Sequence, residues 1–108
     1  MSYNGMMGHL VVIDSSAESV FVSSITLPEK TYWIGARKFS SVYSWDTGPE
    51  KGVELSYTNW GQNQPSGVSS DPCLAMNSTG SWQDASCQLS FLYIIEYERM
   101  RRESFQFV

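Results

Sequence analysis

The chain has 108 residues, of which 42% are hydrophobic and 17% charged, and its formal net charge is −4 at pH 7. This length suits one domain with a modest core, and the acidic balance excludes the basic stripe that nucleic-acid binding proteins need. No apolar run approaches a transmembrane span, so no membrane insertion is expected. We expect a single domain over residues 1–108, with a core from about residue 8 to 98 and a tail over 99–108.

The first quarter of the chain predicts one strand and one helix. Residues 8–13 form a short apolar, β-branched run that is typical of a strand. Ser15 and Glu18 then have the spacing of a capping box, in which each side chain bonds a free amide at the start of a helix. A helix of about ten residues should follow, and Pro28 helps to end it. The helix is indicated by Val20, Phe21, Ser24 and Ile25, which fall near helical spacing.

After residue 31 the sequence predicts short strands and turns. The expected strands are residues 32–35, 43–45, 74–76, 80–82 and 91–97. The last of them is the most apolar and should be central in a sheet. Residues 55–71 are rich in Gly, Asn, Gln, Ser and Pro and show almost no apolar periodicity. A loop of that length inside a domain is usually functional or disordered. The fold class is therefore predicted to be α+β.

Cys73 and Cys87 are the only cysteines, and their spacing fits neither a zinc ribbon nor a Cys-x-x-Cys redox site. They form either one disulfide or two buried thiols, and the polar segment between them favours the disulfide. Such a bond would contribute about 3 kcal/mol and requires an oxidising compartment. Asn77 begins an N-glycosylation sequon in the same segment. An extracellular protein, secreted or the ectodomain of a membrane protein, is thus expected, although the N-terminus shows no signal peptide.

Catalysis is poorly supported by the sequence. His9 is the only histidine, and it lies in the predicted first strand with no nucleophile in its neighbourhood. Asp71 and Asp84 resemble the carboxylate pair of a glycosidase, but nothing signals the cleft that such an enzyme needs. The basic residues of segment 99–102 are interpreted as a solvated exit, with a phosphate or lipid-headgroup patch as the alternative. We expect a binding module and no enzyme.

A set of motifs in the same order resembles the C-type lectin-like domain family from about Gly8 to Glu96. No single motif is specific, but chance does not explain the whole series with near-family spacing. The motifs are Gly8-His-Leu10, Ser15-x-x-Glu18, Trp33-Ile-Gly35, Trp45, Asn59-Trp60, Pro65, Cys73, Trp82-x-Asp84, Cys87 and Tyr93-Ile-Ile-Glu96. The resemblance implies a double-loop fold with residues 55–71 as the long loop. It also implies Cys73–Cys87 as the inner disulfide and the four tryptophans as core residues.

Two departures from the family pattern concern the ends of the chain. The family's outer disulfide would join positions near Ser2 and at Ile95, and neither is a cysteine. Much of the family's first strand and first helix is also missing from the pattern. The final strand therefore needs another cover for its edge. Tail residues 103–108 and a second copy of the chain, which would make an oligomer, are the two candidates.

The resemblance also implies a calcium site in the long loop that holds the ion and, through it, the hydroxyls of a sugar. Calcium accepts six to eight oxygens in flexible geometry, with carboxylates supplying the charge. The positions that match the family's ligands are Gln64, Ser66, Asp71, Gln83 and Asp84, and the first four of them would also contact the sugar. Ser66 is short and neutral, and Gln83 is one methylene longer than the family's asparagine. Both departures weaken the predicted site. In sugar-binding members the proline of the first triplet, here Pro65, is typically cis.

Three functions are compatible with this pattern. The first is calcium-dependent recognition of a glycan or glycoprotein, and the second is calcium-independent binding of a protein partner. The third is a purely structural module. The Ser66 and Gln83 replacements distinguish the first two, since they weaken the metal site without removing the fold. The abundant serines and threonines leave ice binding as a more remote alternative.

Overall fold

The computed structural model describes residues 2–3, 6–67, 72–97 and 105–107. Its described part contains one α-helix, one short 3-10 helix and eight strands, which confirms the α+β class. The elements in chain order are β1 (Ser2–Tyr3), β2 (Met6–Leu10), α1 (Ser16–Ser24), β3 (Thr31–Phe39), β4 (Val42–Trp45), η1 (Gly48–Glu50), β5 (Cys73–Asn77), β6 (Trp82–Ala85), β7 (Leu92–Tyr97) and β8 (Phe105–Phe107).

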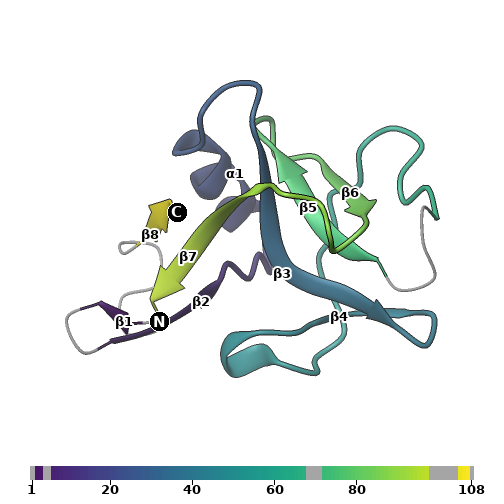
Figure 1. The fold of residues 1–108 in the computed structure, drawn as a ribbon, viewed down its shortest axis with the longest axis horizontal. Coiled ribbons are helices and arrows are strands. Elements are labelled where there is room, and N and C mark those ends of the chain that lie inside the picture. The colour runs from purple at the N-terminus through teal and green to yellow at the C-terminus, as the bar shows by residue number, and fades with distance from the viewer. Residues whose placement is uncertain (1, 4–5, 68–71, 98–104, 108) are drawn as a thin grey trace.

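The strands form one branched sheet around the long strand β3 (Figure 1). The main path runs β1-β2-β7-β3-β5-β6, with β4 paired to β3 and β8 paired to β7. All pairs are antiparallel except β3 with β7. The last apolar strand, β7, lies inside the path, as predicted. In its described residues, up to Gly67 and again from Pro72, the long polar segment between η1 and β5 has no strand or helix of its own, which agrees with its predicted loop character.

The first predicted strand is shifted in the structure. It was expected over residues 8–13, but β2 ends at Leu10 and residues 11–13 are irregular. The reason lies in their hydrogen bonds. The Val11 amide donates to Ile94 O and the Val11 carbonyl accepts from Gly35 N, so this residue bridges two different strands. Gly35 permits this approach because a Cβ there would lie 3.1 Å from Leu10 O and would also clash with Thr47.

Helix α1 begins where the capping pattern predicts. Ser15 is the N-cap, and its hydroxyl accepts a hydrogen bond from the Glu18 amide at 3.1 Å. The apolar residues that indicated the helix do not face the core, however. Val20 is 68% exposed and Phe21 37%, whereas the buried residues of the helix are Glu18, Ser19 and Val22. The apolar spacing therefore located the helix but not its orientation on the core.

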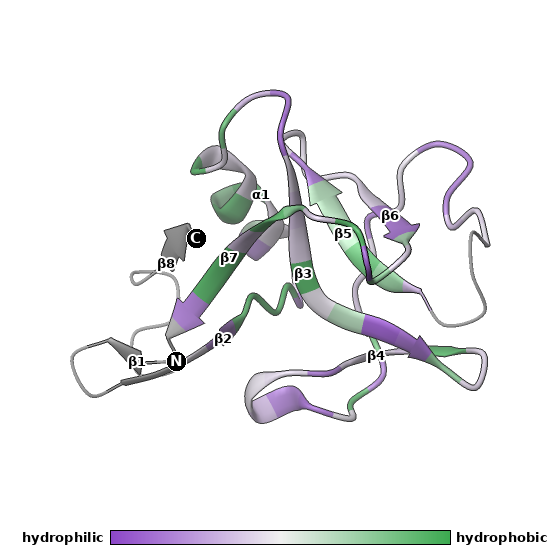
Figure 2. Cartoon of the chain, viewed as in Figure 1, coloured by the Kyte–Doolittle hydropathy of each residue, from purple (hydrophilic) through white to green (hydrophobic). Residues whose placement is uncertain are grey.

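The sheet carries a different apolar cluster on each of its two faces. The main core contains Trp45 and Trp82, and α1 covers it through Val22. A smaller cluster lies on the other face around Trp33, whose ring is 4.8 Å from that of Phe91. Three of the four tryptophans are buried as predicted, while Trp60 is only partly buried at the edge of the main core. Figure 2 shows hydrophobic residues concentrated in β5, β7 and the segment after β2.

The tail supplies the cover that β7 needs. Strand β8 pairs antiparallel with β7, with Ile95 opposite Gln106, on the side away from β2 (Figure 1). Ile95 occupies the position where the family pattern has a cysteine, and it is 1% exposed and packs against Leu10. The structure thus confirms both the predicted apolar packing of Ile95 and the tail as the edge cover. No helix in the described residues is long and apolar enough to cross a membrane.

Candidate functional site in the long loop

The long loop is fixed at its base by main-chain bonds to strand β6. The amide of Trp82 donates to Asn59 O at 2.8 Å, and the amide of Gly61 donates to Trp82 O at 2.9 Å. The ring of Trp60 meets the ring of Trp82 edge-on at 6.1 Å. Because Trp82 is fully buried, these contacts tie the loop to the main core and leave its outer part, including Gln62, Asn63 and Pro65, exposed.

Asp84 holds the outer part of the loop. Its Oδ1 accepts from the Ser66 amide at 2.7 Å and the Ser66 hydroxyl at 2.9 Å, and its Oδ2 accepts from the Gly67 amide at 2.7 Å. We call these three bonds the loop anchor. Asp84 itself is only 3% exposed, whereas Ser66 and Gly67 are exposed. Burial disfavours the charged form of a carboxylate, and hydrogen bonds donated to its oxygens compensate for that cost.

Gln64 places an oxygen in the same part of the loop. The Gln64–Pro65 peptide bond is cis, in agreement with the family pattern. The side-chain oxygen Oε1 is buried, and no described residue donates a hydrogen bond to it. A buried acceptor without a donor costs about 1–3 kcal/mol, so such atoms are uncommon in native proteins. The Gln64 side chain lies near the base of the loop, since a Cβ at Gly61 would be 3.8 Å from Gln64 Cγ and 3.4 Å from Trp82 O.

The other predicted ligands behave differently. Gln83 pairs across the ladder with Ala75, while Asp84 pairs with Leu74. Successive residues of a strand point to opposite faces. Gln83 is therefore directed to the face of the Trp33 cluster and Asp84 to the face of the main core. The prediction for Asp71 lies outside the described residues. Within them, no three His, Cys, Asp or Glu side chains come together as a metal-binding group.

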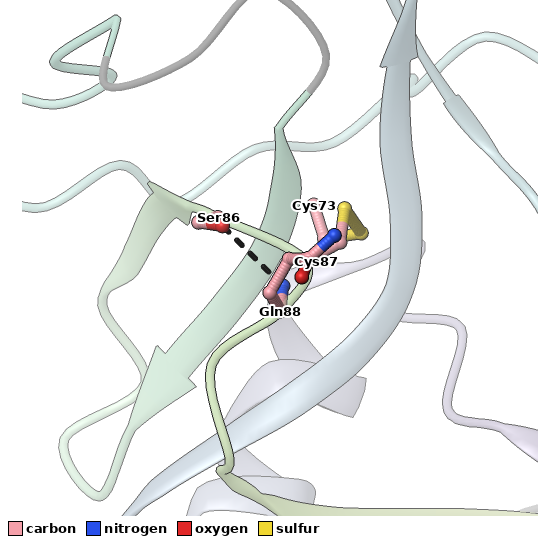
Figure 3. Close-up of a disulfide and its surroundings, with 4 residues drawn as sticks. All are labelled: Cys73, Ser86, Cys87 and Gln88. Carbon is pink, nitrogen blue, oxygen red and sulfur yellow. Dashed lines mark hydrogen bonds between the residues drawn. A yellow bond between two sulfur atoms is a disulfide. The ribbon is translucent and has the colours of Figure 1, made fainter.

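Cys73 and Cys87 form the expected disulfide, with a Cα–Cα distance of 5.1 Å. The bond joins the start of β5 to the turn after β6, so it closes the hairpin that carries Asp84. Figure 3 shows the turn beside it, where the Ser86 hydroxyl accepts a hydrogen bond from the Gln88 amide at 3.3 Å. The disulfide thereby restrains the strand from which Asp84 reaches the loop.

The predicted glycosylation residue, Asn77, is the last residue of β5, at the opposite end from Cys73. It is exposed, and its Oδ1 accepts from the Thr79 amide at 3.0 Å and the Thr79 hydroxyl at 2.7 Å. The side-chain oxygen is thus held by the sequon's own threonine, and also by the Ser81 amide at 3.0 Å.

Tyr43 connects the hairpin of β3 and β4 to the loop. Its ring contacts that of Trp60 edge-on at 5.1 Å. Burial raises the pKa of the Tyr43 hydroxyl above its usual value of 10.0, and the negative charge of Asp84 raises it further. Neither Tyr43 as a neighbour of Asp84 nor Gly67 as its donor was predictable from the sequence, because both depend on how the loop folds back. A glycine with positive φ, as Gly67 has, is the one local signal for such a turn.

Comparisons with known proteins agree with the geometry. The family model of the Lectin C-type domain matches residues 4–96. The chain is a C-type lectin domain. It is 32% identical over 88 residues to human C-type lectin domain family 17, member A, covering 82% of this chain but 23% of that relative. The lectin domain thus spans about a quarter of the relative's length.

Two solved structures show the same fold. The carbohydrate-recognition domain of the mouse scavenger receptor C-type lectin has a TM-score of 0.68 and 26% identity, over 82% of this lectin domain and 69% of that chain. A calcium-independent type II antifreeze protein has a TM-score of 0.65 and 27% identity, over 82% and 65% respectively. The predicted lectin-like fold is therefore confirmed. The family binds carbohydrate and usually Ca²⁺, and the antifreeze protein shows that calcium-independent members exist.

Proposed function

We propose that this domain recognises a glycan or glycoprotein outside the cell, through a weak calcium site in the long loop. The observation that carries the proposal is the buried Gln64 Oε1, an acceptor that no described residue satisfies. A cation satisfies such an oxygen, and hard oxygen ligands are those that calcium prefers. Gln64, Ser66, Asp71 and Asp84 would hold the ion, and calcium would in turn bind vicinal hydroxyls of the sugar.

The fit of the residues to calcium is partial. Asp84 supplies the negative charge, and its donors Ser66 and Gly67 lie in the exposed loop, where water could replace the carboxylate if a cation bound it. The Ser66 hydroxyl already donates to Asp84 and would contribute only a lone pair of its oxygen. Gln83 would have to reach the ion around the outer edge of β6, the last strand on the main path of the sheet. This weakened ligand set supports an affinity at the low end for extracellular modules, about 10⁻³ M.

A second function is favoured by the loop anchor itself. Three protein donors already satisfy Asp84, so the loop holds its shape with no cation. The likeness to a calcium-independent protein supports the same alternative. In that case the domain would bind a protein partner through the exposed loop. The disulfide and the exposed sequon support an extracellular setting for either function.

Calcium titration by calorimetry, followed by a glycan array with and without chelator, tests the proposal. With a dissociation constant near 1 mM, 10 mM calcium should stabilise the fold by about 1.4 kcal/mol. Asp84→Asn should abolish both the heat and the stabilisation, whereas Glu54→Gln, an exposed site, should preserve them. Calcium-dependent glycan binding supports the first function. If neither calcium nor any glycan binds, the proposal is wrong and the protein-binding alternative replaces it.

A further inference from the structure

The hairpin of β3 and β4 presents two different faces at its end. Lys38 pairs across the ladder with Tyr43, and Arg37 pairs with Ser44. Alternation along the strand places the first pair on the face of the main core and the second on the opposite face. Arg37 lies over the ring of Phe39 at 5.1 Å, on that opposite face. Arg37 and Lys38 therefore lie on opposite faces of the sheet, and of the two only Lys38 lies on the same face as Asp84.

Lys38 lies beside the long loop in two independent ways. Its amide donates to Pro72 O at 3.0 Å, so the strand runs alongside the point where the loop returns to β5. Its Nζ lies 5.8 Å from the centroid of the Tyr43 ring, and that ring contacts Trp60. Figure 1 shows the same arrangement, with the end of the hairpin and the long loop on one side of the molecule. Lys38 therefore contacts Tyr43, and Tyr43 in turn contacts Trp60 of the long loop.

The turn between β3 and β4 has a backbone conformation that is unfavourable for residues other than glycine. Ser40 and Ser41 have φ of 47° and 74°, in the left-handed region that favours glycine. Such residues cost of order 1–3 kcal/mol each and persist where the surrounding structure requires them. Two left-handed residues make the tight turn that matches the twist of a hairpin. The hairpin therefore turns directly after the Phe39–Val42 pair, one pair beyond Lys38 and Tyr43.

The charge of Lys38 has no counterpart among the described residues. It rests on an aromatic ring, and no described carboxylate makes an ion pair with it. The whole protein carries a net charge of −4, with only seven Lys and Arg residues. A single cation beside the loop of an acidic protein gives a local preference for negative groups, because opposite charges attract where solvent is partly excluded.

We propose that Lys38 forms a second subsite, which binds the acidic group of a glycan held by the long loop. The chemistry that it recognises is an oxyanion, either a sugar carboxylate or a sulfate ester. The Tyr43 ring contacts the ammonium group, and its hydroxyl is close enough to Asp84 to feel the charge of that carboxylate. This inference rests on the proposed glycan recognition and specifies its ligand as an acidic oligosaccharide.

The test uses matched oligosaccharides that differ only in charge. A neutral N-acetyllactosamine, its sialylated form and its 6-sulfated form are titrated into the protein at low and physiological salt. We expect the acidic forms to bind about three- to fivefold more tightly than the neutral one, the range of a partly exposed charge pair. Comparison of the sialylated with the sulfated form distinguishes the two oxyanions. The preference should shrink as salt rises.

Three variants make the test specific to Lys38. Lys38→Gln should remove the preference and leave neutral binding unchanged, Lys38→Arg should retain it, and Lys51→Gln, an exposed lysine, should have no effect. Equal weakening of neutral and acidic ligands by Lys38→Gln would overturn the subsite. Neutral binding with no acidic preference would overturn it too, while the proposed function would stand. Failure of every glycan to bind would refute both.

Discussion

Two buried carboxylates, Glu96 and Asp84, hold segments of backbone in this protein, and their surroundings differ. Glu96 is 0% exposed and its Oε1 accepts from the Val12 amide at 3.2 Å. Asp84 is 3% exposed and accepts from Ser66 and Gly67. The donor to Glu96 belongs to a segment that is itself buried, since Val12 is 1% exposed. The donors to Asp84 belong to an exposed loop.

This difference determines what each carboxylate can do. If the bond to Glu96 were lost, the buried Val12 amide could not form a hydrogen bond to water instead. The bond is therefore part of the core. If Asp84 released Ser66 or Gly67, those amides would be hydrated at little cost. A cation can therefore compete for Asp84 but not for Glu96. Burial of the carboxylate alone does not mark a binding site. The exposure of its hydrogen-bond donors does.

The largest expected effect comes from removing Glu96. Glu96→Ala leaves a cavity and a buried amide without an acceptor, and should lower the free energy of unfolding by about 2–4 kcal/mol. Glu96→Gln keeps an acceptor oxygen and should cost less. Chemical denaturation measures both values. Calcium and glycan affinities of the folded protein should stay unchanged, and a loss of affinity in Glu96→Gln would contradict the structural role assigned to this residue.

A smaller effect is expected from Asp84→Asn in the absence of calcium. The asparagine keeps one acceptor oxygen, and the exposed donors can bond water, so the loss should be about 1 kcal/mol. Amide hydrogen exchange separates the two carboxylates. Asp84→Asn should accelerate exchange at Ser66 and Gly67 and leave Val12 unchanged, whereas Glu96→Gln should do the reverse. Acceleration of all three amides by one variant would mean that the two regions unfold together.

The sequence predicted the framework of the fold better than the loop. Ser15 and Glu18 located the start of α1, and Cys73, Cys87 and the apolar run of β7 located the sheet, because these signals are local. The apolar spacing located α1 but did not indicate its buried face, because tertiary packing orients the helix on the core. The predicted ligands gave residue types but not their directions. The opposite orientations of Gln83 and Asp84 depend on the register of β5 with β6. The subsite at Lys38 depends on where the loop returns to the sheet.

The smallest expected effect is also the most direct test for a cation at Asp84. The raised pKa of Tyr43 arises first from burial and second from the charge of Asp84. Well below pH 10.0 the tyrosine is protonated in both the folded and the unfolded state. As the pH rises above that value, the unfolded chain ionises first, so folding stability falls. Asp84→Asn should lower the Tyr43 pKa while leaving it above 10.0, because burial remains.

Calcium bound at Asp84 should shift the same pKa in the same direction, because the ion cancels the charge that disfavours tyrosinate. The tyrosinate absorbance of the wild type minus that of Tyr43→Phe isolates this one residue among six tyrosines. Glu54→Gln serves as the charge control and should leave the titration unchanged. If calcium lowers the Tyr43 pKa in the wild type but not in Asp84→Asn, the ion lies at the carboxylate. A shift of equal size in both proteins would place the ion elsewhere, and Asp84 would then resemble Glu96 in serving only the fold.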